Sequence, residues 1–335
     1  MKGEGFAVIV NANAKRGGRR IAAQIARALP GARVKRTQSA EELTEWLRSI
    51  NARSLKCVFA AGGDGTTIGL LNALNVVIPV DQPFPRIGLL PLGTGNAWAR
   101  TVGARKLGWA VHWLAERSGE VDKLPTRRFN LVECEGKLAS FAGSGWDAQV
   151  LNDFRSQVEA AKGPSKVVAK SVYGYLGAIA FRTVPKSVIF GRPRVLLENL
   201  GTRGYKVTPD GRIEPLENLK VGQILYDGFV GVSGAATIPE YGFGFKAFPW
   251  AERIPGLINM RIYDDNAARA FSRIATLWRG EYVPGMNDWF LESCRMTFSR
   301  PCPFQIGGDP LGERRSVDFK ISSRVAEVLY WRALA

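Results

Sequence analysis

The sequence of 335 residues contains a single histidine, His112. It lies in residues 109–117, whose composition predicts a helix, so we interpret it as a packed or surface helix residue. One histidine nearly excludes a Ser-His-Asp hydrolase and a histidine-rich metal site. Carboxylates are therefore left as the acid and base groups for any catalysis.

Cysteines and long apolar runs are also scarce. The four cysteines are Cys57, Cys134, Cys294 and Cys302, and no two form a C-x-x-C pair. This spacing indicates neither a zinc cage nor a disulfide framework, and reduced thiols of a cytosolic protein are the default. No apolar run approaches the roughly 18 residues of a membrane span, and residues 6–10 are too short for a signal-peptide core. We expect a cytoplasmic protein; if it works on membranes, it would bind their inner face peripherally.

Acidic residues are outnumbered by basic ones, which gives a formal net charge of +16 and a pI near 10.0. Such a balance favours a polyanionic partner, which includes nucleic acid, an anionic membrane surface and phosphate-bearing substrates. A hydrophobic content of 46% with 23% charged residues is typical of a globular protein. The length suits two domains, or one large one, with a sizeable core.

Residues 60–67 pack three glycines around one carboxylate, directly after an apolar run. The central residues are Gly62, Gly63, Asp64 and Gly65. Glycines permit positive φ and a close approach of the backbone to a ligand. We expect Thr66 to cap the helix that follows and the loop to present amide donors to a phosphate. A tight strand-to-helix turn is the alternative.

Apolar runs of strand length alternate with segments of helical spacing through the first hundred residues. Strands are expected at residues 5–11, 32–37, 57–61 and 85–92, and helices at 19–29, after the capping box of residues 39–42, and after each glycine loop. The alternation predicts a parallel, doubly wound α/β sheet. The loops after its strands would converge at one edge, which favours the phosphate-binding interpretation over the simple turn. The sequence contains neither a P-loop pattern nor G-x-G-x-x-G.

From about residue 121 the pattern changes to short strands and turns. Strands are expected at residues 129–134, 187–197, 224–232 and 257–263, with a hairpin at 209–212 and helices at 166–182 and 267–278. We predict an α/β domain over residues 1–128, completed by 322–335, and a β-rich, sandwich-like domain over 129–321.

A basic segment lies at residues 162–194, where seven basic residues occur with no acidic one. They are Lys162, Lys166, Lys170, Lys186, Arg182, Arg192 and Arg194. Aromatic and aliphatic residues are interleaved with them, a pattern that suits a protein resting on an anionic bilayer. A core helix with a solvated basic rim is the alternative. No nucleic-acid-binding module is recognisable, so nucleic acid is not an expected partner.

Two motifs carry a resemblance to a known family. Residues 62–66 read GGDGT, with Asn72 in the next helix, and residues 91–96 read PLGTGN. These resemble the diacylglycerol kinase catalytic-domain family, which includes bacterial lipid kinases and sphingosine and ceramide kinases. Weaker matches continue at residues 143–148, 241–244, 249–251 and 308–311. NAD kinases share the first motif but not the GTGN form of the second.

The resemblance implies ATP-dependent phosphorylation of a lipid hydroxyl, with Mg²⁺ bridging the phosphates in an interdomain cleft. Asp64 is the first candidate for a catalytic or metal-linked role, Asp309 is a candidate general base, and Asp147 would face the cleft. The implied nucleotide-binding residues are Asn11, Gly62, Gly63, Gly65, Thr66, Gly93, Thr94, Gly95 and Asn96. The leading expectation is conversion of diacylglycerol to phosphatidic acid. Another lipid, or weakened or lost transfer, is the alternative.

The sequence departs from the family at four places. The first-loop N-P-x-S-G reads Asn11-Ala12-Asn13-Ala14-Lys15 and retains only its leading Asn. The D-G-E of the second domain reads Gly307-Gly308-Asp309, so the carboxylate is shorter by one methylene. The D-G before a late strand, linked in bacterial members to a structural metal, reads Pro255-Gly256, and we expect no such site. The family's Glu after GGDGT is Gly69. The sequence leaves open the lipid, the choice of base between Asp64 and Asp309, and the oligomeric state, for which a homodimer is possible.

Overall fold

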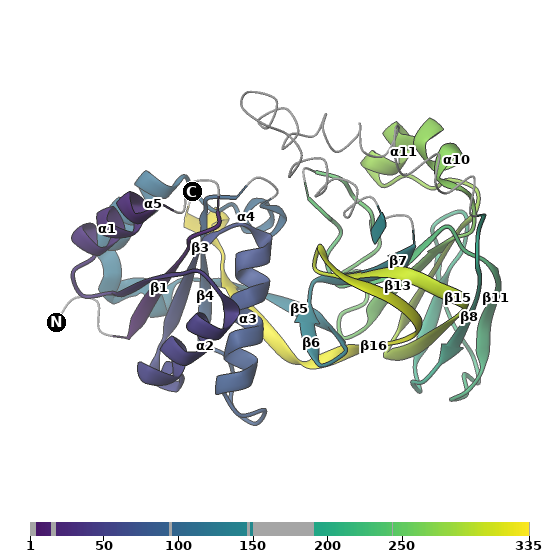
Figure 1. The fold of residues 1–335 in the computed structure, drawn as a ribbon, viewed down its shortest axis with the longest axis horizontal. Helices are drawn as coiled ribbons and strands as arrows, with labels where there is room; N and C mark the ends of the chain where they lie inside the picture. Colours follow the sequence, from purple (N-terminus) through teal and green to yellow (C-terminus); the bar gives the residue numbers. More distant parts are fainter. Residues whose placement is uncertain are drawn as a thin grey trace. The chain divides into compact units, whose positions relative to one another are not determined.

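The chain divides into two compact units, residues 1–130 with 323–335, and residues 131–322. The computed structural model describes residues 5–14, 18–93, 96–145, 148–149, 191–242 and 244–334. The chain passes from the first unit to the second within strand β5 (Thr126–Cys134) and returns within strand β16 (Asp309–Leu329) (Figure 1).

The first unit is built on a parallel sheet. Its strands are β1 (Phe6–Asn11), β2 (Arg33–Thr37), β3 (Cys57–Gly62), β4 (Arg86–Pro91) and the end of β16. They lie in the order β2-β1-β3-β4-β16, and every neighbouring pair is parallel. The helices are α1 (Arg19–Ala28), α2 (Ala40–Ser49), α3 (Asp64–Val77), α4 (Ala97–Val102) and α5 (Leu107–Arg117), with short 3-10 turns η1 (Ala52–Ser54), η2 (Ser118–Lys123) and η4 (Trp331–Leu334). The predicted parallel α/β fold is confirmed.

The sequence of each strand reflects its place in this sheet. The central strands β1 and β3 are almost completely buried, which explains their continuous apolar runs. The edge strand β2 reads RVKRT and is only partly buried. Helix α2 begins at the predicted cap, because the Ser39 hydroxyl accepts a hydrogen bond from the Glu42 amide at 3.2 Å. The Glu42 carboxylate reaches the Gln38 amide at 2.8 Å and so satisfies a second donor.

A buried arginine of β16 fixes the far end of helix α3. The Arg324 guanidinium lies over the Phe84 ring, 4.0 Å from its centroid. It donates to the side chain of Asn75 and to the backbone oxygens of Ile78, Pro79, Val80 and Gln82. Burial lowers the pKa of Arg324. The C-terminal strand therefore satisfies carbonyl groups at and beyond the end of α3, which have no partner within the helix.

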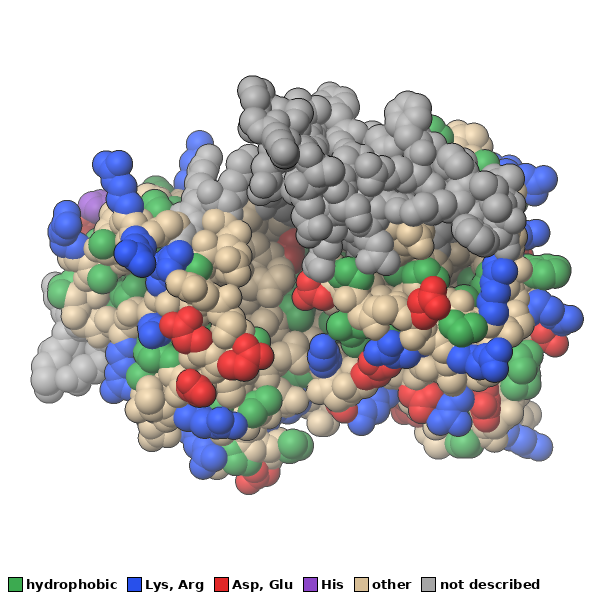
Figure 2. Space-filling view, in the orientation of Figure 1, with side chains coloured by type: hydrophobic (Ala, Val, Ile, Leu, Met, Phe, Trp, Pro, Cys, Tyr) green, Lys and Arg blue, Asp and Glu red, His purple; other side chains and the backbone are tan. Residues whose placement is uncertain are grey.

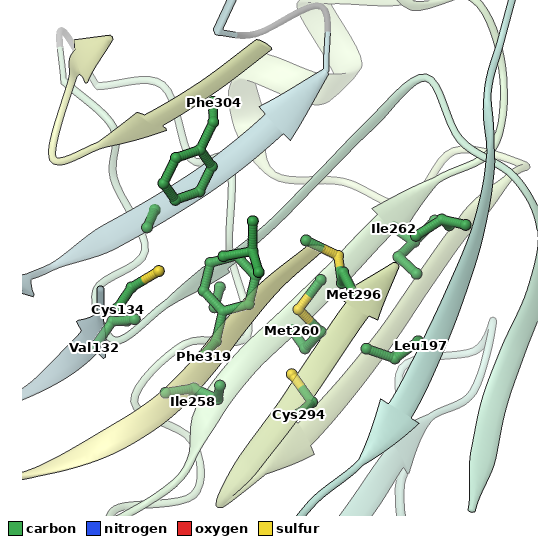
Figure 3. Close-up of a cluster of buried hydrophobic side chains, with 14 of the residues drawn as sticks. Val132, Cys134, Leu197, Ile258, Met260, Ile262, Cys294, Met296, Phe304 and Phe319 are labelled. Carbon is green, nitrogen blue, oxygen red and sulfur yellow. The ribbon is translucent and has the colours of Figure 1, made fainter. Parts of the chain in front are cut away.

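The second unit is β-rich and mostly antiparallel. Its elements are β6 (Lys137–Ala139), β7 (Phe141–Gly145), β8 (Arg194–Asn199), β9 (Gly204–Val207), β10 (Ile213–Pro215), β11 (Ile224–Phe229), β12 (Val232–Ala236), β13 (Ile258–Tyr263), β14 (Met286–Leu291) and β15 (Ser293–Ile306), with helices α10 (Ala267–Ser272) and α11 (Ile274–Arg279). The main order is β10-β9-β14-β13-β12-β7-β15-β16, and β8 joins β15 to β11. Side chains such as Met260, Met296 and Phe319 form the core between these strands (Figure 3).

Two expected elements of this unit are divided in the structure. The strand expected at residues 224–232 is two strands, since β11 pairs with β8 whereas β12 pairs with β7 and β13. The change of partner falls at Gly231, whose backbone oxygen packs against Gly145; a Cβ on Gly145 would lie 2.4 Å from it. The helix expected at residues 267–278 breaks at Arg273, where φ is −108° and ψ is 16°. Helical periodicity continues across such a break, so periodicity alone did not reveal it.

An ion pair is buried between β13 and β14. The Arg261 guanidinium binds both Asp288 oxygens at 2.8 Å and the Ala247 carbonyl at 2.7 Å. The two side chains are 9% and 5% exposed. Removing one partner of such a pair leaves an uncompensated buried charge.

We predict that Asp288→Asn lowers the free energy of unfolding by about 3–5 kcal/mol, because Arg261 keeps its charge in a buried place. Urea denaturation followed by circular dichroism measures the change. The matched control is Asp227→Asn, because the Arg194–Asp227 pair is half exposed, and its loss is expected to cost about 1 kcal/mol or less. Equal losses in the two variants would contradict this account of the buried pair.

Candidate active site

Three loops of the first unit begin at the same edge of its sheet. Strand β1 lies beside β3, and β3 beside β4, with Gly62 paired to Pro91 at their ends. The loops that follow begin at Asn11, Gly62 and Pro91. In doubly wound sheets ligands bind outside the carboxyl ends of the strands. The edge predicted from the sequence is therefore the edge at which these segments lie.

The Asp64 carboxylate joins the second loop to the third. One oxygen accepts a hydrogen bond from the Ala97 amide at 2.9 Å, and the other from the Trp98 amide at 3.0 Å. These amides are the first of helix α4 and have no partner within that helix. A carboxylate at a helix N-terminus is stabilised by charge-assisted hydrogen bonds and by the helix dipole. Asp64 therefore caps α4 from a distant part of the sequence.

The glycines of these loops are needed for close contact. A Cβ on Gly62 would lie 2.0 Å from the Thr66 hydroxyl, and one on Gly93 would lie 2.5 Å from the Gly63 Cα. None of these glycines, nor Gly65, has a positive φ. The expected use of positive φ in this loop is therefore wrong. The glycines allow two backbone segments to touch, and the Gly62 carbonyl accepts from the Gly93 amide at 3.1 Å.

Positive φ occurs instead at Asn96, where it is 50°. The Asn96 side chain donates to the Gly93 carbonyl at 2.8 Å. Its Oδ1 atom is buried and has no hydrogen-bond partner among the described residues. Because buried polar atoms are nearly always paired, this oxygen is a candidate acceptor for a ligand or a water molecule. Thr94 and Gly95 lie outside the described residues.

Thr66 lies inside helix α3, which begins at Asp64 with Gly63 as its N-cap. The expectation that Thr66 caps this helix is therefore wrong. The Thr66 hydroxyl instead accepts a hydrogen bond from the Asn11 side chain at 2.8 Å. This bond ties the first loop to the second, so all three loops are connected.

The second-unit carboxylate, Asp309, lies at the hairpin between β15 and β16. Gly307 and Gly308 have φ of 59° and 88°, and Asp309 pairs with Ile306 across the turn. Two successive positive φ values are typical of a two-residue hairpin turn, for which glycine is favoured. Gly307 and Gly308, at the positions of the D and G of the family's D-G-E, therefore form the two-residue turn of this hairpin. Asp309 is exposed, and Asp147 lies outside the described residues.

A bound metal ion would depend on Asp64. The described residues contain no group of three or more His, Cys, Asp or Glu side chains that could hold a metal. Asp64 is the only acidic residue in segments 11–14, 62–66 and 91–96. Mg²⁺ is commonly held by one or two carboxylates together with substrate phosphates. The residues present fit a metal that arrives with a nucleotide.

The four cysteines are buried and free of disulfides. Burial raises the pKa of Cys134 to about 12 and that of Cys302 to about 11. Burial also raises the pKa of Cys57 and of Cys294. Because the thiolate is the reactive form, these thiols are inert near neutral pH.

An apolar cavity of about 60 Å³ in the second unit was missed by the sequence analysis. Its lining includes Tyr241, Phe245, Phe248, Tyr263, Leu277 and Met286. Arg261 contributes to the wall, and the Ser233 hydroxyl, also in the wall, is buried without a partner among the described residues. The available signal was Arg261 itself, the one charged residue in the strand INMRIY.

The site and fold define a class: a parallel α/β domain with glycine loops at the carboxyl edge of its sheet, followed by a β-rich domain. Residues 5–124 match the family model of the diacylglycerol kinase catalytic domain. The resemblance carried by the motifs is therefore confirmed for residues 5–124, which match this family model. The matched model describes a kinase catalytic domain, so the match supports a phosphotransferase.

Individual relatives agree with this assignment. The eye-specific diacylglycerol kinase of Drosophila melanogaster is 39% identical over 77 residues, which are 23% of this chain and 5% of that protein. This chain thus spans a small part of that relative. A solved structure of a candidate diacylglycerol kinase from Bacillus anthracis str. Sterne has a TM-score of 0.67 at 17% identity, covering 100% of this chain and 98% of that one. A diacylglycerol kinase structure from the same strain has a TM-score of 0.60 at 14% identity, covering 99% and 98%. Because the sequence identities are this low, the two structures show only that this chain shares their fold.

We predict that Gly93→Ala lowers the free energy of unfolding by about 1–3 kcal/mol, because its Cβ would overlap Gly63. Thermal unfolding measures the effect. The control is Gly69→Ala in helix α3, where a Cβ meets nothing within 4 Å. That substitution is expected to stabilise the protein by up to about 1 kcal/mol. If both substitutions act in the same direction, the close packing of the loops is not what the glycines provide.

Proposed function

We propose that the protein is an ATP- and Mg²⁺-dependent lipid kinase that phosphorylates a lipid hydroxyl, with diacylglycerol as the leading substrate. The observation that carries the proposal is the connection of the three loops through Asp64 and Thr66. A phosphoryl transferase depends mainly on holding phosphates in place and stabilising their charge. Preformed loops provide such positioning before the substrate binds.

The phosphates would lie against the N-terminal end of α3. This helix has 14 residues and begins directly at the glycine loop. Its dipole favours a negatively charged group at this end. Gly62, Gly63 and Gly65 carry no side chain that would keep a phosphate away from this backbone. When bound, Mg²⁺ would neutralise charge on the phosphates.

The two candidate carboxylates would have different roles. Both oxygens of Asp64 accept backbone hydrogen bonds, so we assign it to positioning the loops, with contact to the metal. Asp309 lies on a tight hairpin and is exposed, and we assign it as the general base. It would take the proton of the lipid hydroxyl while that oxygen attacks the γ-phosphorus and ADP leaves.

The apolar cavity of the second unit supports a lipid acceptor. Its aromatic and aliphatic lining suits part of an acyl chain, and the Ser233 hydroxyl offers one polar contact. The cavity is small, so most of a diacylglycerol molecule would remain outside it, at the protein surface or in the bilayer.

We predict that the purified protein transfers phosphate from ATP to diacylglycerol in mixed micelles, and that Asp64→Asn and Asp309→Asn each lower kcat by about 10²-fold or more. The two variants are expected to differ in their affinity for ATP. Asp64→Asn should weaken ATP binding, whereas Asp309→Asn should leave it unchanged. Asp81→Asn, at an exposed position of the first unit, is the control. The kinase assignment fails if no lipid in a panel with sphingoid bases and ceramide is phosphorylated.

A second candidate function is nucleotide or lipid binding with weak or lost transfer. The glycine hairpin favours it, because Asp309 follows the turn with a shorter side chain than the family's glutamate. ATP binding without turnover on any lipid would support this function. Recovery of activity in Asp309→Glu would instead show that the short carboxylate limits an otherwise complete site.

Peripheral membrane association is part of the proposal. None of the helices in the described ranges is long and apolar enough to cross a membrane. Of the basic segment at residues 162–194, Arg192 and Arg194 are described, and the five lysine and arginine positions from Lys162 to Lys186 lie outside the described residues. Among the described side chains on the face shown in Figure 2, basic and acidic groups are interspersed. The basic segment at residues 162–194 is therefore a stronger candidate for the membrane contact than the described side chains of this face.

We predict salt-sensitive sedimentation with anionic vesicles, weakened when Lys166, Lys170 and Lys186 are changed to glutamate. Each reversal removes about 1 kcal/mol of attraction near the surface. The matched control reverses three lysines elsewhere, Lys35, Lys137 and Lys220, with the same change in net charge. Equal effects of the two triple variants would leave only a general charge effect and no role for this segment.

A further inference from the structure

A polar groove of about 480 Å³ in the second unit is separate from the loops described above. It lies beside α10 and α11, which are neighbours in Figure 1. Three arginines line it, Arg192, Arg269 and Arg273. The other charged lining residues are Asp264 and Asp265. No part of the proposed transfer reaction uses these residues.

Two of the three arginines, Arg192 and Arg269, are held in place by contacts that leave some of their N–H donors unused. Arg192 donates through Nη1 to the backbone oxygen of Asp264, and its guanidinium lies 5.4 Å from the centroid of the Phe229 ring. Arg269 uses Nη1 to bind both oxygens of Asp265, at 3.2 and 3.3 Å. A guanidinium carries five N–H donors, so each of these side chains has Nε and Nη2 donors beyond these contacts. Fixed guanidinium groups with remaining donors suit a planar or tetrahedral oxyanion.

The charges in the groove favour an anion. Asp265 is paired with Arg269, so its charge is largely offset. The pKa of Asp264 is raised, mainly by burial, and the nearby Arg192 partly opposes this shift. The three arginines outnumber the two aspartates, which leaves a positive balance.

The groove and the apolar cavity are lined by residues that are adjacent in the sequence. Asp264 and Gly285 line the groove, and the adjacent residues Tyr263 and Met286 line the cavity. Phe229, at the groove, is 51% exposed. An arginine-lined groove next to apolar surface matches an amphiphile with an anionic head.

We propose that this groove is a binding site for a phosphate monoester, the group shared by a phosphorylated lipid and by small soluble phosphates. Arg192, Arg269 and Arg273 would bind the phosphate oxygens through their remaining donors. The site goes beyond phosphate transfer, because it would bind a phosphate that is already attached to its carrier. It requires no turnover, so its failure and the failure of the kinase proposal are separate results.

Calorimetric titration with glycerol phosphate, and sedimentation with phosphatidylcholine vesicles with or without phosphatidic acid, test the site on the full-length protein. We expect binding that Arg273→Gln weakens by about tenfold, as expected for loss of charge-assisted hydrogen bonds. Arg279→Gln is the control, because Arg279 ends helix α11, which begins directly after Arg273, pairs with Glu281 and does not line the groove. It is expected to bind as the wild type does.

The two arms distinguish the source of the phosphate. Binding to both ligands shows that the phosphate group is sufficient, and binding only to phosphatidic acid vesicles shows that the lipid is required. Either result supports the site if Arg273→Gln weakens it and urea unfolding shows that the variant is folded. No binding to either ligand, or equal binding by Arg273→Gln and Arg279→Gln, overturns the proposal. If Arg273→Gln does not fold, Arg192→Gln takes its place, with the same expected loss of phosphate binding and the same result that would overturn the proposal.

Discussion

The two hydrogen bonds from the Asp64 carboxylate to the first amides of α4 are the constraint on which the site depends. They connect loops that lie more than thirty residues apart in the sequence and follow adjacent strands. Without the Asp64 carboxylate, the Ala97 and Trp98 amides would lose their hydrogen-bond acceptors. The loop of residues 91–96 would then lose these bonds to the loop of residues 62–66. Asp64 of the GGDGT motif and Asn96 of the PLGTGN motif therefore form the start of α4 together. Asn96 turns the chain into α4 so that the amides point at the carboxylate.

The same loops are held from two further directions. The Asn11 side chain fixes Thr66 at the start of α3, and Arg324 fixes the carbonyls at its end. Helix α3 is therefore secured at both ends, by the first strand of the chain and by the last. In the second unit the buried Arg261–Asp288 pair plays a comparable part for β13 and β14. It fixes one wall of the apolar cavity, where an unpaired charge would be costly.

Much of the first unit could be predicted from the sequence because the inner parallel strands β1, β3 and β4 are largely buried and read as apolar runs. The order of strands and loops then placed the glycine segments on one edge. The reason for the glycines was not predictable, since it lies in the contact between Gly63 and Gly93 from different loops. The partners of Arg261 and Arg324 are also distant in sequence, 27 residues away for Asp288 and 249 for Asn75. The division at Gly231 depends on a change of neighbouring strand, which local alternation of residues does not encode.

The central claim is that the joined loops form the nucleotide phosphate site. Its most direct test is the affinity for ATP, measured by calorimetry, in the wild type, Gly93→Ala and Gly69→Ala. The account predicts a loss of about tenfold or more in Gly93→Ala, where the Cβ would push the loops apart, and wild-type affinity in Gly69→Ala, where it meets nothing. Equal affinity for ATP in all three folded proteins would contradict it.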